Sequence, residues 1–513
     1  MNIGFIPAKQ AALAPHRTAV IDVPNGRRVT FGELDARVRR LGNGLSGLAG
    51  VGRGERVAIF AKNCIEYLEL MFACARVGLI AQPMNWRLAL PEIEKIVRGG
   101  EPMVFASSAE FRKERDALQG LVDLPHWLEF GAGADGSYET LLATASEDEP
   151  AISASVGGHD PMLILYTGGT TGESKGALHS HHSLYMGMLN QTVAERVVPT
   201  DVYMLTGQMF HIPVGLAINY MAHGCPVVLV NFEARQALEL IQEEKVSAFL
   251  GITTMLNWMM AVENFGSYNL KSLRNIQYGG GPMPASVVRA ALEAFPCTLI
   301  QGYGQTEGMT MTFLSQEDHA GAVRGDRPER LRSCGREGFV TRVQLLDANG
   351  RPVPRDGKTT GEIVVRSEAN MLGYWRRPDL TAQTIRDGWM WTGDVAYWDT
   401  EGYVYIVDRA KDMIISGGEN IYSTQVENAI HRHPAVLESA VIGIPDPEWG
   451  ESVKAVVVLK PGMSATEQEI IDEAKRHLAS YQKPKSVSFV ESLPKAPTGK
   501  ILKRELRKLY GGS

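Results

Sequence analysis

Threonine, glycine and lysine residues gather in the segment "YTGGTTGESKG", residues 166–176. Glycine has no Cβ, so its backbone N–H groups can approach an anion closely, and threonine hydroxyls can donate to the same anion. Lys175 adds one mobile positive charge, which suits a terminal phosphate that leaves. The segment therefore predicts a phosphate-binding loop, although it lacks the Gly-Lys-Ser/Thr ending of the usual nucleotide-binding lysine loop. A Gly/Thr turn with a surface lysine is the alternative.

Two further glycine-rich segments follow short apolar stretches in the same way. They are "NIQYGGGPMP" and "TLIQGYGQTEG", and the first loop is itself preceded by "PMLILY" at 161–166. Each stretch reads as a buried strand that delivers the chain into glycines. Because ligands of α/β proteins gather at the carboxyl ends of strands, the three strand ends predict one shared cleft.

Alternating helical and strand patterns must position these loops. Thr30 and Glu33 form a capping box before apolar residues at helical spacing, and "RVAIF" then precedes a helix from about 63 to 77 that Gly78 can end. This pattern is typical of an α/β fold with mainly parallel sheets. From about residue 340 short β-like stretches indicate a β-rich subdomain. The tail from about 411 adds two strands, a polar helix near 466–478 and a basic end that reads as a solvated helix face.

The composition fits a soluble globular protein of more than one domain. The chain has 513 residues, 44% of them hydrophobic and 21% charged, with a formal net charge of -6. That charge favours a small-molecule or protein partner over nucleic acid. Five scattered cysteines read as reduced, mostly buried thiols, and neither a secretory signal nor a transmembrane run is evident. We expect a cytoplasmic location, with peripheral attachment and a homodimer both left open.

Later segments occur in a recognisable order after the first loop. "QGYGQTEG" (301–308), "WMWTGDVAYWDTEGYVYIVDRAKDMIISGGENIY" (389–422) and "PKAPTGKILKREL" (494–506) resemble the adenylate-forming superfamily, which includes acyl-CoA and aryl-CoA synthetases, peptide-synthetase adenylation domains and luciferases. The resemblance covers essentially the entire chain. It implies a large N-terminal domain of several subdomains at 1–409 and a small mobile α+β C-terminal domain at 410–513.

The resemblance implies a reaction in which Mg-ATP activates a carboxylate to an acyl-adenylate, after which most members transfer the acyl group to a thiol. Glu307, helped by the Thr167 hydroxyl, would hold Mg²⁺, since hard cations prefer oxygen ligands. A carboxylate at a helix N-terminus is the alternative for Glu307. The nucleotide-binding residues implied are Thr167, Gly168, Gly169, Thr170, Thr171, Gly172, Lys175, Gly280, Gly281, Gly302, Tyr303, Gly304, Gln305, Thr306, Asp394 and Arg409.

Individual roles follow from what each group can do. Tyr303 can stack on adenine, or can be ordinary core. Asp394 can accept both ribose hydroxyls while Arg409 donates to the same sugar, with a turn aspartate and a surface ion pair as alternatives. Lys500 in "PTGK" is the residue expected to stabilise the charge that develops between the carboxylate and the α-phosphate. Lys495, Lys503 and Lys508 are interpreted as lysines without a role.

The resemblance also implies a rotation of the small domain between the half-reactions, with the hinge at Lys411. Gly417 and Gly418 would line a passage for the thiol of CoA. Trp449 is a weaker candidate for contact with CoA, and packing within the small domain is equally open. Gly168, Ser174 and the missing proline after Tyr422 depart from the pattern of many relatives, without removing a required group.

The acid is read from the segment "MFHIPVG" at 209–215. Amino-acid-activating relatives place an aspartate where His211 stands, which argues against an α-amino acid; His211 can bond or gate beside the acyl carboxylate, or be a core histidine. "HSHH" (179–182) lacks a second ligand cluster, so metal binding there is not expected. The pocket candidates, each of which can also be core, are His211, Met255, Trp258, Met259, Gly279, Met309 and Met311. This methionine-rich set favours a fatty or aromatic acid.

We therefore predict an AMP-forming carboxylic acid:CoA ligase that uses ATP, Mg²⁺ and CoA. A second hypothesis keeps the adenylation but transfers the acyl group to an amine, a carrier protein or oxygen. The intact glycine passage favours CoA. A third, a nucleotide-binding relative without activity, conflicts with the retention of Lys175, Glu307, Asp394, Arg409 and Lys500.

Overall fold

The computed structural model describes residues 1–131, 136–167, 174–281, 283–417, 419–495 and 501–511. Its chain divides into two compact units. The first comprises Met1–Thr167, Lys175–Val343 and Val365–Met390, and the second comprises Gly168–Ser174, Gln344–Val364 and Trp391–Ser513. Each unit is described by itself below.

Within the described part of the first unit, one sheet has nine strands in the order β15-β14-β13-β12-β11-β9-β10-β1-β2. The strands from β1 through β10, β9, β11 and β12 to β13 pair in parallel, and antiparallel neighbours close both edges. Their bounds are β1 Thr18–Asp22, β2 Arg27–Thr30, β9 Tyr203–Leu205, β10 Val227–Leu229, β11 Ala248–Leu250, β12 Asn275–Gly279, β13 Thr298–Gln305, β14 Met309–Leu314 and β15 Arg336–Glu337.

The second sheet of this unit has seven strands among the described residues, in the order β18-β8-β7-β4-β3-β5-β6. Strands β7, β4, β3, β5 and β6 are parallel, while β8 and β18 continue the sheet in antiparallel pairing. Their bounds are β3 Arg56–Phe60, β4 Ile80–Pro83, β5 Val104–Ser108, β6 His126–Phe130, β7 Pro161–Thr167, β8 Lys175–Ser180 and β18 Gly373–Tyr374. The predicted α/β class with mainly parallel sheets is confirmed.

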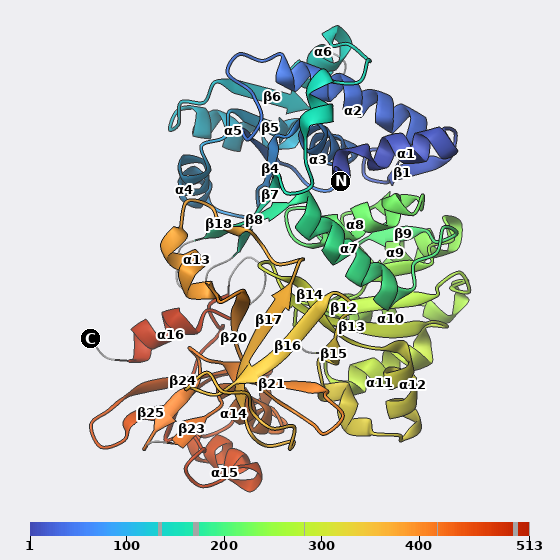
Figure 1. Cartoon of the computed structure of the whole chain (residues 1–513). Helices are drawn as coiled ribbons and strands as arrows, with labels where there is room; N and C mark the ends of the chain where they lie inside the picture. Colours follow the sequence, from blue (N-terminus) through green and yellow to red (C-terminus); the bar gives the residue numbers. More distant parts are fainter. Residues whose placement is uncertain (132–135, 168–173, 282, 418, 496–500, 512–513) are drawn as a thin grey trace. The chain divides into compact units, whose positions relative to one another are not determined.

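Helices cover these sheets and carry most of the connections between parallel strands (Figure 1). Every residue of α3 is buried, so this helix lies inside the largest core cluster. The helices of the unit are α1 Ile6–Leu13, α2 Phe31–Ser46, α3 Ile65–Val77, α4 Leu90–Gly100, α5 Arg112–Gln119, α6 Ser137–Thr144, α7 His181–Glu195, α8 Pro213–Ala222, α9 Ala234–Glu243, α10 Thr253–Met260, α11 Ala285–Ala294, α12 Gln316–Arg324 and α13 Pro378–Thr384, with 3-10 turns at Ile3–Phe5, Ala109–Phe111, Ala151–Ser155, Phe265–Ser267 and Pro328–Arg332.

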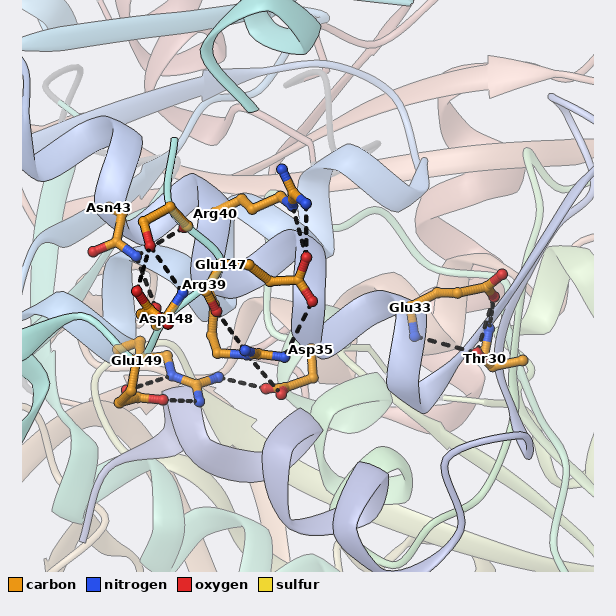
Figure 2. Close-up of polar contacts among 11 residues, drawn as sticks. Thr30, Glu33, Asp35, Arg39, Arg40, Asn43, Glu147, Asp148 and Glu149 are labelled. Carbon is orange, nitrogen blue, oxygen red and sulfur yellow. Dashed lines mark hydrogen bonds and ion pairs between the residues drawn. The ribbon is translucent and has the colours of Figure 1, made fainter. Parts of the chain in front are cut away.

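The two helix ends that the sequence specified most clearly are confirmed. Thr30 and Glu33 make the reciprocal bonds of a capping box at the start of α2, as Figure 2 shows. Gly78 ends α3 in the left-handed conformation, with φ 77°, and its N–H donates to the Cys74 carbonyl. The observed α3 begins at Ile65, two residues later than the predicted start near 63, and Asn63 and Cys64 precede its first turn.

Charged side chains fix α2 to the segment that precedes β7. Arg39 and Arg40 on α2 bond to Glu147 (Figure 2). The buried guanidinium of Arg76 on α3 bonds to Asp35 Oδ1 at 2.6 Å and to Glu149 Oε1 at 2.9 Å. A buried guanidinium needs charged partners. These bonds therefore hold the segment around Glu149, which precedes β7, against α2 and α3.

The β-rich region that the sequence predicted after residue 340 lies mainly in the second unit, although its residues 341–343, 365–367 and 385–390 belong to the first. One sheet has strand order β16-β17-β20-β19, with β21 paired to β20, over β16 Thr341–Leu346, β17 Gly361–Ser367, β19 Ile385–Arg386, β20 Trp389–Trp398 and β21 Val404–Arg409. The tail forms a second sheet, β23-β22-β25-β24 with β26 beside β25, and its elements are β22 Ile414–Ser416, β23 Glu419–Ile421, α14 Ser423–Ile430, β24 Val436–Asp446, β25 Gly450–Leu459, α15 Glu467–His477, β26 Ser486–Phe489 and α16 Lys503–Tyr510.

The boundary between the units falls inside β16, β17 and β20, whereas the sequence predicts domains 1–409 and 410–513. Within the second unit the β-rich sheet region is bonded to the tail: Asp408 Oδ2 on β21 accepts from Ser423 Oγ at 2.8 Å, and Thr360 Oγ1, just before β17, bonds to Tyr422 Oη at 2.8 Å. Those bonds group β20 and β21 with the tail. The functional boundary at residue 409 remains a prediction.

The interpretation of the basic tail from the sequence is partly wrong. Its helical character is confirmed as α16, but the interpretation of Lys503 as a lysine without a role is wrong. Lys503 Nζ lies 2.7 Å from Glu427 Oε1 and 2.6 Å from Ser423 Oγ, with 13% of its side chain exposed. This ion pair fixes α16 to α14. A run of basic residues does not indicate which of its lysines is buried.

Two other expectations can be compared with the structure. All five cysteines lie within the described ranges and are thiols, and four of them are buried, which confirms the predicted mostly buried thiols. A search of the described helices finds none that is both long and apolar enough to span a bilayer.

Glu195 at the end of α7 provides a test of the buried polar core. It accepts hydrogen bonds from Gln191 and from the Tyr220 hydroxyl, and burial raises the pKa of its carboxyl to about 7. A raised pKa in the folded state stabilises the fold below the ordinary value near 4.5, and this stabilisation is lost as pH rises through 7.

We expect the free energy of unfolding of the wild type, relative to Glu195→Gln, to fall by about 2 kcal/mol between pH 5 and pH 8. Denaturant unfolding at a series of pH values measures this difference. Glu239→Gln on the exposed face of α9 is the control. A difference between wild type and Glu195→Gln that does not change with pH would contradict the assignment.

The paired ends of β12 and β13 provide a second test. A Cβ on Gly279 would lie 2.3 Å from the Gly302 carbonyl oxygen, whereas one on Gly281 meets no atom of the described residues within 4 Å. We therefore expect Gly279→Ala to destabilise the fold by about 1–3 kcal/mol and Gly281→Ala by less than about 0.5 kcal/mol, measured by denaturant unfolding. If Gly281 instead lies against a nucleotide, Gly281→Ala will weaken ATP binding without changing stability. Equal destabilisation by both substitutions would show that the strand contact has no special role.

Candidate active site

The carboxyl ends of β12 and β13 lie side by side, as the sequence predicts for its second and third glycine segments. Gly279 is directly opposite Gly302 in the parallel ladder. Gly280 follows with φ 75°, a backbone conformation that side chains rarely adopt. Gly302, Tyr303, Gly304 and Gln305 are still part of β13, so the strand runs through these glycines rather than ending at them.

Gly304 is required by the hairpin between β13 and β14. The register shifts between Tyr303 and Gly304, and a Cβ at Gly304 would lie 1.9 Å from the Met309 carbonyl oxygen. Met309 itself has φ 55°. This tight hairpin leaves Thr306, Glu307 and Gly308 as the turn between the strands. Glu307 is thus on a β-turn, and the alternative that it is a helix N-terminal carboxylate is wrong.

Glu307 is held on both its main chain and its side chain. Its Oε1 accepts a hydrogen bond of 2.7 Å from the Tyr374 hydroxyl, and its carbonyl accepts one of 2.8 Å from the Met371 N–H. Burial, followed by the charge of Glu307, raises the pKa of Tyr374 above its ordinary value, so the hydroxyl keeps its proton and acts as donor. The carboxylate therefore has a fixed position with its other oxygen left for a further partner.

Thr306 is fixed by a histidine of the seven-stranded sheet. His179 Nε2 lies 2.8 Å from the Thr306 carbonyl, and burial lowers the pKa of His179 to about 4. The neutral ring must donate from Nε2, since a carbonyl only accepts. The other histidines of "HSHH" have separate partners: His181 Nδ1 accepts from the Ile3 N–H and His182 Nε2 contacts Glu368.

Thr167 and Lys175 are the two ends of the first glycine loop. They are paired across the β7–β8 hairpin, where the Thr167 hydroxyl lies 3.4 Å from the Lys175 carbonyl oxygen. Lys175 Nζ lies 5.3 Å from the centroid of the Tyr374 ring. The residues that would surround a phosphate between these ends, Gly168, Gly169, Thr170, Thr171 and Gly172, lie outside the described residues, as do Gly418 and Lys500.

The Lys175 end of the first glycine segment and the Glu307 turn of the third, which come from two different sheets, are thus brought together within the first unit. Lys175 on β8 and Glu307 after β13 both contact Tyr374. Sequence reasoning missed Tyr374 and His179 as contacts of this site. The only sequence signal for Tyr374 is its place in "LGYWRRPD", where an aromatic residue follows glycine, and nothing in that pattern names its partner.

The predicted acyl-pocket residues are distributed over several elements. His211 precedes α8 and its ring lies 4.6 Å from that of Phe210, edge to face. Met255, Trp258 and Met259 are on α10; Met259 is a fully buried member of a core cluster, whereas 60% of Trp258 is exposed. Met309 and Met311 are buried on β14. Gly279 is accounted for by its contact with β13. The pocket assignment therefore remains a prediction.

The second unit brings Asp394 and Arg409 together. They are opposite one another on β20 and β21, and Arg409 Nε lies 2.6 Å from Asp394 Oδ1. The ion pair was the alternative for Arg409, yet it also puts both groups where one sugar could contact them. Gly393, with φ 71°, precedes Asp394 within β20 and donates its N–H to Glu362 Oε1 at 2.9 Å.

Two predicted CoA residues contact one another in the same unit. Gly417, with φ 61°, donates to the Trp449 carbonyl at 2.8 Å, and a Cβ at Gly417 would lie 2.6 Å from the Trp449 ring. Lys485 Nζ lies 5.2 Å from the centroid of that ring. Lys411, the predicted hinge, is exposed in the turn after β21. Packing thus accounts for Gly417 without reference to a thiol.

The described residues contain no group of three or more His, Cys, Asp or Glu side chains that could hold a metal by themselves. Glu307 offers a carboxylate and Thr167 a hydroxyl. Oxygen ligands in this small number are what Mg²⁺ takes from a protein when phosphates and waters complete its coordination.

Comparison with known proteins gives the family. Residues 7–375 match the model of the AMP-binding enzymes, and residues 425–500 match that of the AMP-binding enzyme C-terminal domain. The chain is 37% identical to a feruloyl-CoA synthase of Amycolatopsis sp over 99% of both chains. It is 35% identical to the long-chain-fatty-acid–CoA ligase FadD13 of Mycobacterium tuberculosis, over 100% of this chain and 99% of the relative. The crystal structure of ATP-bound MatB from Rhodopseudomonas palustris superposes with a TM-score of 0.87 at 29% identity, over 100% and 99% of the two chains.

These matches extend over both predicted domains and over nearly the full length of each relative. The chain therefore belongs to the AMP-binding enzyme family and, within it, to the acyl-CoA synthetase branch of adenylate-forming acid:CoA ligases.

Proposed function

We propose that this ligase activates a fatty or aromatic carboxylic acid with Mg-ATP and transfers the acyl group to CoA. In the first step a carboxylate oxygen attacks the α-phosphorus of ATP, which gives the acyl-adenylate and pyrophosphate. In the second the thiol of CoA displaces AMP and releases a proton, which gives the thioester. The observation that carries this proposal is the joint contact of Lys175 and Glu307 with Tyr374, which puts a cation and a carboxylate on one aromatic residue.

The glycine loop and Lys175 are assigned to the β- and γ-phosphates. Attack by a carboxylate on a polyphosphate brings like charges together, so the site must supply positive charge and N–H donors where pyrophosphate departs. Lys175 supplies the charge at one end of the loop, and the loop residues from Thr167 to Gly172 supply the donors. The β7–β8 pairing supports the assignment because it fixes both ends of the loop.

Magnesium is assigned to Glu307 with help from Thr167. When bound, the ion neutralises phosphate charge and polarises the phosphoryl oxygens. The donor set fits a hard cation that is shared with a nucleotide, since the described residues hold one carboxylate at this place and not a complete protein cage. Glu307 would bind the ion, and Tyr374 and Met371 would orient Glu307.

The remaining nucleotide contacts are proposed from the family resemblance. Tyr303 on β13 would stack on adenine, with Gly280 and Gly281 on the opposite side. Asp394 would accept from the ribose hydroxyls and Arg409 would donate to the sugar, which requires their present ion pair to share its atoms with the ligand. Lys500 would stabilise the charge at the α-phosphate during adenylation.

The second half-reaction is assigned to a different arrangement of the tail. Rotation at Lys411 would replace Lys500 by the segment around Gly417 and Gly418, and Trp449 would lie near CoA. The contact of Gly417 with Trp449 supports a rigid local structure at this place. Because the ring already occupies the position where a Cβ would stand, any side chain at 417 would displace it.

The class of acid is argued from the relatives and from the sequence of the pocket. The relatives named above are a feruloyl-CoA synthase and a long-chain-fatty-acid–CoA ligase, so both of their acids are larger and more apolar than acetate. The methionines near β14 and α10 are compatible with either acid. His211, in place of an aspartate, supports an acid without an α-ammonium group.

A panel of acids tests the overall reaction. We expect pyrophosphate release with ferulate, other cinnamates or long-chain fatty acids in the absence of CoA, and thioester only after CoA is added. Acetate and phenylalanine are the controls, and each should react at least about a hundredfold more slowly as judged by kcat/KM. Pyrophosphate release and the acyl product are measured by a coupled assay and by mass spectrometry. Adenylate without thioester would direct attention to an amine, a carrier protein or oxygen as acceptor.

The role of Lys500 is tested on the separate half-reactions. Lys500→Ala should lower adenylation by about 10²–10³-fold, because one charge-stabilising donor is lost from the transition state. The reaction of a supplied acyl-adenylate with CoA should stay within about twofold of wild type. Lys508→Ala, which loses only a contact to Glu505 in the same helix, is the matched control. An equal loss in both half-reactions would contradict the alternation of the tail.

A further inference from the structure

We propose that Tyr374 is a positioning residue, which holds the Glu307 carboxylate ready for Mg²⁺ and keeps Lys175 apart from it. The proposal deepens the proposed function and rests on it, since it concerns the same Mg-ATP site. Neither the loop motif nor the "QTEG" motif includes Tyr374, which lies far from both in the sequence.

The bond to Glu307 uses one carboxylate oxygen and leaves the other. Tyr374 Oη donates to Oε1 at 2.7 Å, and the Met371 N–H fixes the carbonyl of the same glutamate. A glutamate in a turn would otherwise sample several rotamers, and ordering it would weaken metal binding by the entropy lost. With Oε1 held, Oε2 and the free lone pair of Oε1 have defined directions before the ligand arrives.

Lys175 contacts the face of the same ring. Its Nζ lies 5.3 Å from the ring centroid, within the range of a cation–π interaction. Over the part of the chain that the structure describes, Lys175 and Glu307 make no ion pair with each other. Direct pairing would neutralise the groups that phosphate and Mg²⁺ need, whereas Tyr374 contacts the cation through its ring face and the carboxylate through its hydroxyl, which leaves each available for its ligand.

Tyr374 is itself rigidly placed by the strand that carries Lys175. On β18 it is opposite Ala177 of β8, and Ala177 and Lys175 lie on one face of that strand because side chains alternate. The diagonal neighbour of Tyr374 is therefore Lys175. Thr381 Oγ1 accepts the Tyr374 N–H at 2.9 Å, and the ring is buried with Ala177 and Met371.

The test compares two tyrosine-to-phenylalanine substitutions in the full chain. Tyr374→Phe removes the bond to Glu307 and keeps the ring against Lys175. Tyr138→Phe removes an equivalent buried bond, also 2.7 Å long, from a tyrosine hydroxyl to Glu69 in another part of the same unit. ATP binding without any acid or CoA is measured by calorimetry, once with Mg²⁺ and once with EDTA.

We expect Mg²⁺ to tighten ATP binding in the wild type and in Tyr138→Phe. In Tyr374→Phe the tightening by Mg²⁺ should fall about tenfold or more, as expected for loss of a hydrogen bond to a charged group, while binding in EDTA stays within twofold. Tyr374→Phe should also have no further effect on the tightening by Mg²⁺ in a Glu307→Gln background, because the carboxylate that Tyr374 is proposed to position for Mg²⁺ is then absent. Tyr374→Leu, which removes the ring too, should weaken ATP binding in EDTA as Lys175 loses its support.

Three results would overturn the proposal: equal weakening by Tyr374→Phe with and without Mg²⁺, an unchanged Mg²⁺ effect, or no Mg²⁺ effect in the wild type. If Tyr374→Phe does not fold, Tyr374→His takes its place, and its ring N–H should preserve more of the Mg²⁺ effect than Tyr374→Leu. The outcome of the acid panel does not depend on the outcome of this test. A wild type that binds Mg-ATP through Tyr374 but activates none of the acids would disprove the proposed substrate and leave the positioning role in place.

Discussion

The hydrogen bond between the Tyr374 hydroxyl and Glu307 is the interaction on which the arrangement of the candidate site depends. Glu307 is on the turn of the β13–β14 hairpin at the edge of the nine-stranded sheet, and Tyr374 is on the edge strand β18 of the seven-stranded sheet. His179 and Met371 add bonds to the main chain of the same turn. The two sheets of the first unit thereby fix one short turn. Without these bonds a glycine-flanked turn would be free to move.

The same arrangement explains why so many glycines surround the site. Gly279 and Gly304 meet neighbouring backbone at distances that exclude a Cβ, so their first role is to let strands approach. Gly281 meets no described atom in the same way, and its surroundings are open to a ligand. Glycines of one motif therefore occur for different physical reasons, and those with open surroundings are the ones proposed to contact the nucleotide. The close contact of Gly304 with β14 also determines where the turn that contains Glu307 begins.

The sequence predicted the fold class, the capping box of α2, the end of α3, the strands that lead into the glycine loops and the family. Those features depend on local patterns, such as the spacing of Thr30 and Glu33 or the place of Gly78. It did not predict that Tyr374 and His179 hold the turn of Glu307, because these contacts join residues far apart in the chain. Lys503 was misread for the same reason: its partners Glu427 and Ser423 come from α14. The Asp394–Arg409 pair was foreseen as two site residues, while their mutual ion pair follows from the register of β20 and β21.

Charge separation links the structure to the chemistry. Lys175 and Glu307 have opposite charges and are proposed to bind opposite ligands, so a site that let them pair would have to break that pair before each turnover. The aromatic ring of Tyr374 contacts the cation through its face and the anion through its hydroxyl, and its buried position keeps both contacts in place. In the second unit the corresponding pair, Asp394 and Arg409, is bonded directly, which suits two groups that contact one neutral sugar. A neutral ligand can share the atoms of an ion pair, whereas a phosphate and a metal ion compete with it. Lys175 and Glu307 are kept apart, as their proposed binding of phosphate and metal requires, and Asp394 and Arg409 are paired, as their proposed binding of ribose permits.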